Sequence, residues 1–448
     1  MAIPLDKRRD PDEVLGAADV PWLLRRLGAP SSLTRHQLGV LRASGAATLF
    51  ANYGLGIMGL ALVQIQAGLH VSEAAIGGVT AFVQLGMIPA LVVTMWADSA
   101  GRRRLLLISI LGFSLAAGLT ALVQGAPEFI AAQLLARVFI FSATMLAVVV
   151  VAEELDADAR GWGIGMVGAA GALGHGLVSI VFANVNVLPY GWRALYGLGV
   201  LPLLFLPRFQ RGLRETRRFA RHSETRMHAA GLRAALQPLA HVVRMYPGRM
   251  AALCTALFPA ALVFETATMF QSKFLQEAHH YAPGNVALLY LTVGVVVPIG
   301  NVVGGSLGDR FGRKRVMVSA LIGNAVAVAL FYHMDGVWVP LSWGLMNLTI
   351  AIVTVLFAAL GSELFPTSYR STAAGVRSIV ATLGAVAGLW TEGRLYVLTG
   401  THAAAITGML VVTPIAPLIV AACLPETASC ELEEISPERG PHSKPQSE

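Results

Sequence analysis

The sequence has little charge for its length. Of its 448 residues, 13% are charged and 55% are hydrophobic, whereas a soluble globular domain carries about 25% charged residues. This shortage argues against an ordinary soluble enzyme and indicates a chain that crosses a membrane many times. The net charge of +7 does not indicate nucleic-acid binding, because the arginines gather in segments between apolar runs.

The sequence also lacks the patterns that carry chemistry in enzymes. Its three cysteines, Cys254, Cys423 and Cys430, have no metal-ligand spacing and supply no disulfide framework. A nucleotide-binding loop, a metal cluster and a nucleophile triad are all missing from the pattern. We therefore expect no enzymatic activity, no cofactor, no metal and no nucleic-acid partner. The polar stretch after Met1 contains no apolar segment of a cleavable signal peptide.

Long apolar runs, by contrast, fill most of the chain after residue 40. A helix that crosses a bilayer needs about 20 residues, and twelve runs approach or exceed this length, six on each side of a basic segment. The predicted crossings are Val40–Gln66, Ala74–Ala97, Leu105–Val123, Phe129–Ala152, Gly161–Val185, Trp192–Leu206, Met250–Leu275, Val286–Leu307, Val316–Tyr332, Val337–Leu360, Thr372–Tyr396 and Ala403–Leu424.

The segments between these runs differ in charge. Arg208–Arg249 holds ten arginines against two acids, and the basic clusters at Arg102 and Arg313 lie on the same side of the predicted membrane. Since positive loops stay in the cytoplasm, we expect both termini there, in a plasma membrane of the bacterial inner-membrane type. The predicted parts are a cytoplasmic arm (1–38), a six-helix bundle (39–207), a basic linker (208–249), a second six-helix bundle (250–424) and a cytoplasmic tail (425–448).

The two halves repeat each other at a nearly constant offset. Asp98 and Asp309 are 211 residues apart. The other matched pairs, each 210 residues apart, are Glu153 with Glu363, Arg160 with Arg370, Gly165 with Gly375, and Gly174 with Gly384. Internal repeats of this kind are typical of transporters with a site between the halves near the midplane. The expected fold is an all-α membrane protein of twelve transmembrane helices in two pseudo-symmetric six-helix bundles.

A glycine-rich stretch with one acid and a cluster of cations joins two runs in each half. The second copy is Gly304–Arg315 (GGSLGDRFGRKR), and the weaker first copy is Thr94–Arg104. Glycines allow helices to approach closely and the chain to turn tightly. The pattern resembles the signature of the major facilitator superfamily. In the first copy Thr94 and Ser99 stand where the signature has glycine and arginine.

Two further patterns resemble the sugar porters and their relatives, the aromatic acid and metabolite:proton symporters. An acid and an arginine seven positions apart follow the fourth and tenth runs, and the segment 424–427 (LPET) follows the last. The resemblance implies a cytoplasmic gate that breaks and re-forms as two bundles alternate; the alternative is that these charges only set the topology. The expected gate residues are Asp98, Arg102, Glu153, Arg160, Asp309, Arg310, Arg313, Glu363, Arg370 and Glu426.

Arg137 lies about two turns inside the fourth run, where a charge is costly and indicates function. In the sugar porters that the chain resembles, an arginine at this position faces an acid of the first run. Here Ala51 and Gly54 stand at the acidic positions, so the partner is missing from this half. Arg137 is therefore expected to bind an anionic substrate, to be structural, or to partner the coupling group.

Glu265 is the acid nearest the middle of a run, and Pro259 before it permits a bend. A carboxylate in an apolar cavity can exchange protons near neutral pH, so Glu265 is the expected proton-coupling residue; binding of a cationic substrate and a place at the outer rim are the alternatives. Further candidates, each of which could instead join helices by hydrogen bonds, are Asn52, Tyr53, Gln64, Gln84, His175, Asn301, Trp343, Asn347 and Trp390.

These patterns favour secondary active transport of a small organic anion by alternating access, in symport with protons. The expected partners are the solute, protons and the lipid bilayer, and the expected functional unit is a monomer. The alternatives are efflux of amphipathic drug-like compounds by proton antiport, a sugar or polyol facilitator, and a non-transporting membrane sensor on the same fold. Ala260 and Ala261 replace glutamines that sugar porters carry in the seventh run, which weakens the sugar interpretation.

Overall fold

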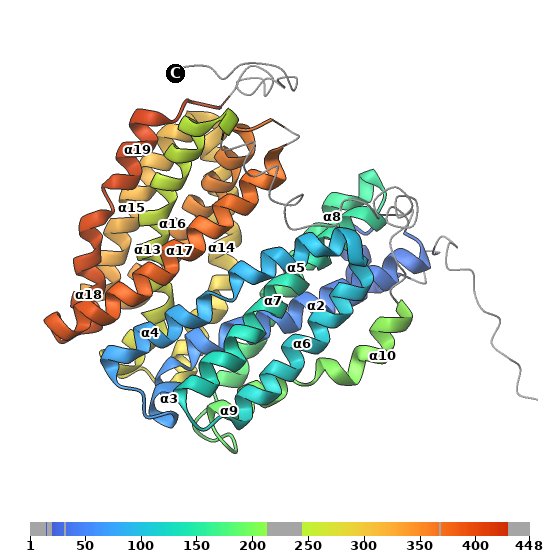
Figure 1. The fold of residues 1–448 in the computed structure, drawn as a ribbon, viewed down its shortest axis with the longest axis horizontal. Coiled ribbons are helices and arrows are strands. Elements are labelled where there is room, and N and C mark those ends of the chain that lie inside the picture. Colours follow the sequence, from blue (N-terminus) through green and yellow to red (C-terminus); the bar gives the residue numbers. More distant parts are fainter. Residues whose placement is uncertain (1–14, 16–19, 31–32, 213–243, 367–368, 429–448) are drawn as a thin grey trace, which may run out of the picture.

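The computed structural model describes residues 15, 20–30, 33–212, 244–366 and 369–428. Its regular elements in these ranges are helices, and they form two bundles (Figure 1). Most of the predicted arm (1–38), the central part of the linker (208–249) and most of the tail (425–448) lie outside the described residues. The prediction of an all-α fold of two bundles is confirmed by this arrangement.

The first bundle contains ten helices in the described part of the chain. They are α1 (Trp22–Arg26), α2 (Arg35–Leu60), α3 (Leu62–Gly68), α4 (Glu73–Gln84), α5 (Met87–Ala100), α6 (Arg102–Leu122), α7 (Ala126–Glu154), α8 (Ala157–Phe182), α9 (Trp192–Leu198) and α10 (Pro202–Gly212). The helices of the second bundle are α13 (Pro247–Glu277), α14 (Pro283–Phe311), α15 (Arg313–His333), α16 (Trp338–Glu363), α17 (Arg370–Thr399), α18 (His402–Met409), η2 (Leu410–Val412) and α19 (Ile415–Cys423).

Most of the predicted crossings are present as helices. Ten helices of the described ranges are long and apolar enough to cross a membrane, or eleven if α2 and α3, bent by 68° at their junction, form one span. The predicted run Val40–Gln66 is therefore present as two helices with a bend between them. The run Trp192–Leu206 is also a correction. It is divided into α9 and α10, because Gly199 follows the end of α9 and Pro202 begins α10, and both residue types interrupt helical hydrogen bonding.

The sequence repeat extends to the packing of the helices. Gly174 of α8 lies against α2, where a Cβ atom would clash with the Leu49 carbonyl group. Gly384 of α17 lies against α13, where a Cβ atom would clash with the Phe258 carbonyl oxygen. Each bundle thus has a glycine-mediated close approach between its first and fifth long helices, as expected for helices that pack in lipid.

The two bundles are joined at one end and separate at the other. An apolar core shared by both bundles includes Ile65 and Trp192 from the first and Phe274 and Leu389 from the second. Toward the opposite end each bundle has a core of its own, one around residues 40–209 and one around residues 246–424. Figure 1 shows the same arrangement, with the bundles meeting where α4 crosses α17 and diverging beyond.

We call the joined end the His402 end, after a residue described below, and the other the basic end, after the clusters at Arg102 and Arg313. At the His402 end the backbones of α4 and α17 touch. A Cβ atom on Gly77 would clash with the Leu389 carbonyl oxygen, and one on Gly393 would lie 2.8 Å from the Ala74 carbonyl oxygen. Small residues on both helices therefore allow the bundles to close at this end.

Candidate functional site

Arg137 lies on α7 at the centre of the first bundle and is 4% exposed. Its Nη2 atom approaches the sulfur of Met58 at 3.8 Å, which is its hydrogen-bond partner among the described residues. A guanidinium carries five N–H donors, and a thioether is a weak acceptor. Arg137 therefore presents a buried positive charge with most of its hydrogen-bonding capacity unused, and an unpaired buried charge is costly unless a ligand satisfies it.

Glu265 of α13 supplies the acid that the first bundle lacks. It is half-buried, and its charge interacts with that of Arg137 across the boundary between the bundles. The structure describes no ion pair within 4 Å between these two residues. Among the described residues, Arg137 and Glu265 therefore present a cation and a carboxylate without ion-pair partners, on opposite bundles, and their charges interact.

Polar groups from three more helices surround Arg137. Tyr196 of α9 is 1% exposed, its phenol interacts electrostatically with Arg137, and its hydroxyl has no hydrogen-bond partner among the described residues. His175 of α8 is exposed and also interacts with Arg137. Tyr53 of α2 is buried and donates to the Leu195 carbonyl oxygen at 3.0 Å. A carboxylate bound by Arg137 would thus have a phenol and an imidazole nearby as additional donors.

Three of the other candidates hydrogen-bond within or between helices. Asn52 donates to the carbonyl oxygen of Thr48 at 2.9 Å, within its own helix. Gln64 donates to the side chain of Gln276 at 2.7 Å, between the bundles. Asn347 donates to the Trp343 carbonyl oxygen at 2.9 Å. These contacts are those expected of polar residues that hold helices together.

The remaining candidates do not gather around Arg137 through any contact that the structure describes. Trp343 is buried against Tyr290, with ring centroids 5.8 Å apart. Trp390 is 45% exposed and lies edge-on to Phe82 of the other bundle at 5.5 Å. Asn301 is exposed on α14, and the buried Gln84 has a carbonyl oxygen without a partner in the described ranges.

At the basic end, the expected gate residues pair in the same way in both bundles. The Arg102 guanidinium lies 2.9 Å from the Glu153 carboxylate. In the second bundle Arg313 pairs with Glu363, and it also lies 3.0 Å from Asp309. Each arginine opens a helix, α6 or α15, directly after a glycine of positive φ. The repeated motif therefore positions its arginine against the acid at the end of the neighbouring long helix.

The acid of each loop pairs with the arginine of the glycine-rich motif: Glu153 contacts Arg102 and Glu363 contacts Arg313. Arg370 points its Nε atom at the Phe365 carbonyl oxygen at 3.5 Å, and Arg160 forms no ion pair with Glu153 in the described residues. The side chain of Asp98 lies outside the described part. The charge pairs described at this end lie within one bundle.

Glu426 and Arg310 complete the set of gate candidates. The Glu426 carboxylate accepts hydrogen bonds from the backbone N–H groups of Arg313 and Lys314, at 2.7 and 3.4 Å. It therefore caps the start of α15, where a negative charge is favourable. Gly312 lies directly beside it with φ +98°, leaving no room for a side chain. Arg310 is exposed, and its guanidinium lies 5.3 Å from the Phe311 ring centroid.

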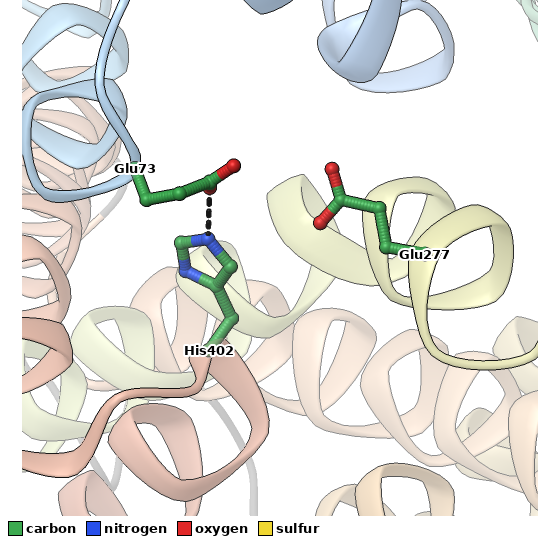
Figure 2. Close-up of side chains that lie close together, drawn as sticks. All are labelled: Glu73, Glu277 and His402. Carbon is green, nitrogen blue, oxygen red and sulfur yellow. Dashed lines mark hydrogen bonds and ion pairs between the residues drawn. The ribbon is translucent and has the colours of Figure 1, made fainter.

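The structure adds a cluster that the sequence patterns did not reveal. Glu73, Glu277 and His402 offer ligand atoms that lie within 4.8 Å of one another (Figure 2). Lys273, 1% exposed, places its ammonium 2.9 Å from Glu73 and 2.5 Å from Glu277. A metal ion between these carboxylates would meet that positive charge at close range. The residues therefore do not fit a metal site. In the sequence, the one sign of this cluster was the charge of Lys273 near the end of the apolar run Met250–Leu275.

Comparisons with known proteins identify a family of membrane transporters. Residues 45–296 and 252–446 match a family model described as Major Facilitator Superfamily. A 3-(3-hydroxy-phenyl)propionate transporter of Escherichia coli is 24% identical over 400 residues, which cover 85% of this chain and 94% of that protein. A probable 4-methylmuconolactone transporter of Cupriavidus pinatubonensis is 26% identical over 286 residues, or 62% of this chain and 65% of that protein.

A solved structure shows the same fold. The inward-open xylose transporter of E. coli superimposes with a TM-score of 0.69 at 19% sequence identity, covering 89% of this chain and 99% of that one. At this identity the likeness establishes the architecture alone. It confirms the predicted two-bundle arrangement of membrane helices.

Proposed function

Because the chain belongs to the Major Facilitator Superfamily and is a membrane transporter rather than an enzyme, we propose that it carries a small organic anion across the membrane together with protons. The observation that carries this proposal is the buried Arg137, whose hydrogen-bond partner in the described residues is a methionine sulfur. An arginine binds a carboxylate through two parallel hydrogen bonds, so the solute would supply the missing counter-charge.

Glu265 is the proposed proton carrier. It belongs to α13 of the second bundle, and its charge interacts with that of Arg137. A bound carboxylate would place two negative charges near one arginine, and this repulsion favours a proton on Glu265. Binding of the anion and of a proton would thereby support each other, as symport requires. The named substrates of the relatives, 3-(3-hydroxy-phenyl)propionate and 4-methylmuconolactone, indicate the size of solute to test first.

The different packing of the bundles at the two ends of the molecule supports a cycle of alternating access. In this structure the bundles share a core at the His402 end and have separate cores at the basic end. In our proposal the protein is a monomer in a bacterial inner membrane, and its basic end and both termini are cytoplasmic. The two bundles (39–207 and 250–424) rock about the site between them. The gate pairs at the basic end would re-form across the bundles in the opposite state.

Reconstituted protein in liposomes gives the test. We expect a labelled aromatic carboxylate to accumulate against its gradient when the outside is acidic, and a neutral sugar not to accumulate. Glu265→Gln should abolish the accumulation while retaining exchange of labelled for unlabelled solute, because the glutamine can neither bind nor release the driving proton.

Asp335→Asn is the matched control, since the Asp335 side chain is 93% exposed and should not affect accumulation. If the Glu265→Gln variant still accumulates the carboxylate, Glu265 is not the proton-coupling residue. Accumulation of sugars alone would overturn the anion assignment, and proton-driven expulsion of the solutes would replace symport by antiport.

A further inference from the structure

At the His402 end, one imidazole bridges two carboxylates. The Nε2 atom of His402 lies 2.8 Å from Glu73 at the start of α4, and its Nδ1 atom lies 2.5 Å from Glu392 of α17. Glu73 belongs to the first bundle, whereas His402 and Glu392 belong to the second. Figure 2 shows the imidazole pointing at Glu73, with Glu277 on the far side of the gap. The imidazole therefore contributes directly to the contact between the bundles.

This geometry requires a proton. A neutral imidazole has one N–H donor and one nitrogen that only accepts, and an ionised carboxylate only accepts. With His402 neutral and both acids ionised, one of the two short contacts would bring a nitrogen lone pair against a carboxylate oxygen, with no proton between the two atoms. The contacts are satisfied only when the imidazole carries a second proton or when one carboxyl group is protonated. The closed arrangement therefore holds one proton that the fully deprotonated cluster does not.

The surroundings of Glu392 independently favour that proton. Glu392 is 0% exposed, and its Oε2 atom has no hydrogen-bond partner among the described residues. Oε2 lies next to Gly77, so the first bundle covers it. An ionised carboxylate with an unsatisfied, dehydrated oxygen is costly. Separation of the bundles would return this oxygen to water and remove the cost, so protonation and closure favour each other.

Other charged groups of the cluster do not replace this proton. Lys273 of α13 contacts Glu73, Glu277 and Gln66, at 2.9, 2.5 and 2.7 Å. Its charge also interacts with that of Glu392, but it donates no described hydrogen bond to Glu392 and so does not fill the contact between Glu392 and His402. The facing phenols are Tyr396 of α17, whose ring lies 4.4 Å from that of His402, and Tyr332 of α15, which interacts with Glu392. The proton that the bridge requires therefore belongs to His402 and its two acids, because these are the groups that share the two short contacts.

We propose that Glu73, His402 and Glu392 form a proton-binding site that locks the two bundles together at the His402 end. The closed state binds one more proton than the open state. By linkage, closure is therefore favoured as the pH falls and is lost as the pH rises. This site is separate from Glu265 and does not depend on which solute is carried, so it gives the transporter a second point at which protons act.

The test is a distance measured across the His402 end as a function of pH. Spin labels would be placed at Ala67, an exposed residue near the end of α3, and at Leu398, 81% exposed near the end of α17, after replacement of the three native cysteines by serine. In lipid nanodiscs the fraction of short distances should fall severalfold between about pH 5 and pH 9. A distribution that does not change with pH would overturn the proposal.

The variant Glu392→Gln tests directly whether closure requires the extra proton. The glutamine amide donates to Nδ1 while Nε2–H donates to Glu73, so every contact is satisfied without the extra proton. This variant should remain closed across the whole pH range. Glu128→Gln is the matched control, because Glu128 accepts a hydrogen bond from the Gln124 backbone N–H and is outside this cluster, and it should open with pH as the native protein does. Opening of Glu392→Gln at high pH would contradict the proposal.

Glu265→Gln separates this proposal from the proposed function. It should keep the pH dependence of the distance even though it loses accumulation of solute. If Glu265→Gln instead abolishes the pH-dependent opening, the proton that controls closure binds at Glu265 and the assignment to His402 is wrong.

Discussion

Replacing Arg137 by methionine is expected to lower the apparent affinity for an organic anion by about thirtyfold to several thousandfold and to leave the fold at least as stable. Loss of one partner from a buried, hydrogen-bonded charge pair costs about 2–5 kcal/mol, and each 1.4 kcal/mol is about tenfold in affinity. The stability expectation follows from burial: without a solute Arg137 has a sulfur atom as its described hydrogen-bond partner, and an apolar side chain of similar length avoids that desolvation cost.

The measurement combines the concentration dependence of exchange with the melting temperature in detergent. Arg193→Met is the matched control, because Arg193 donates to the Val123 carbonyl oxygen at 3.0 Å and lies 4.4 Å from the Trp192 ring centroid. It should lower the melting temperature and leave the apparent affinity unchanged. If Arg137→Met behaves like this control, Arg137 is a structural residue and the anion assignment fails.

Gly77→Val is expected to prevent closure at the His402 end and to reduce net transport about tenfold or more. A Cβ atom at residue 77 would clash with the Leu389 carbonyl oxygen and lie 3.0 Å from the Gly393 backbone nitrogen, and these backbone atoms cannot yield without moving α17. Overpacking of a close interface costs about 1–3 kcal/mol, which shifts the ratio of closed to open molecules by about fivefold to more than a hundredfold. Binding of solute from the open side should persist, because the clash lies away from Arg137.

Gly78→Val is the control for this substitution. Gly78 is the next residue of the same helix, and a Cβ atom added there would meet no atom of the described neighbours within 4 Å. Uptake should be close to normal for this variant and strongly reduced for Gly77→Val, as measured in liposomes at equal protein content. Equal transport by both variants would show that the approach of α4 to α17 is not needed for the cycle.

The architecture was largely predictable from the sequence, because membrane crossing and internal duplication leave strong local signals. The apolar runs located most helices, and the offset between Gly174 and Gly384 marked equivalent packing positions. The bend after Leu60 was not predictable, because the hydrogen bonds that stabilise it come from the other bundle. The hydroxyl of Ser272 and the amide of Gln276 donate to the Leu60 carbonyl oxygen, at 2.7 and 3.4 Å, so the hydrogen bonding lost at the bend is compensated by residues more than 200 positions away.

The candidate site was predictable in its components but not in its pairings. Arg137 and Glu265 stood out as charges inside apolar runs, yet only the fold brings them to the same space. Glu392 lies inside the predicted run Thr372–Tyr396 and carried the same signal, but its partner His402 begins the next helix and Glu73 belongs to the other half. Local sequence does not contain this contact, because it forms only when the two bundles close.

Two pairs of spin labels measured in one series test the central claim, that a single site between the bundles opens to one side at a time. The first pair is Ala67 with Leu398 at the His402 end, and the second is Ala157 with Ser362, which are exposed at the basic end. On addition of a transported carboxylate we expect the distances within the first pair to lengthen as those within the second pair shorten. Distances that lengthen at both ends together, or that change at one end alone, would contradict alternating access by these two bundles.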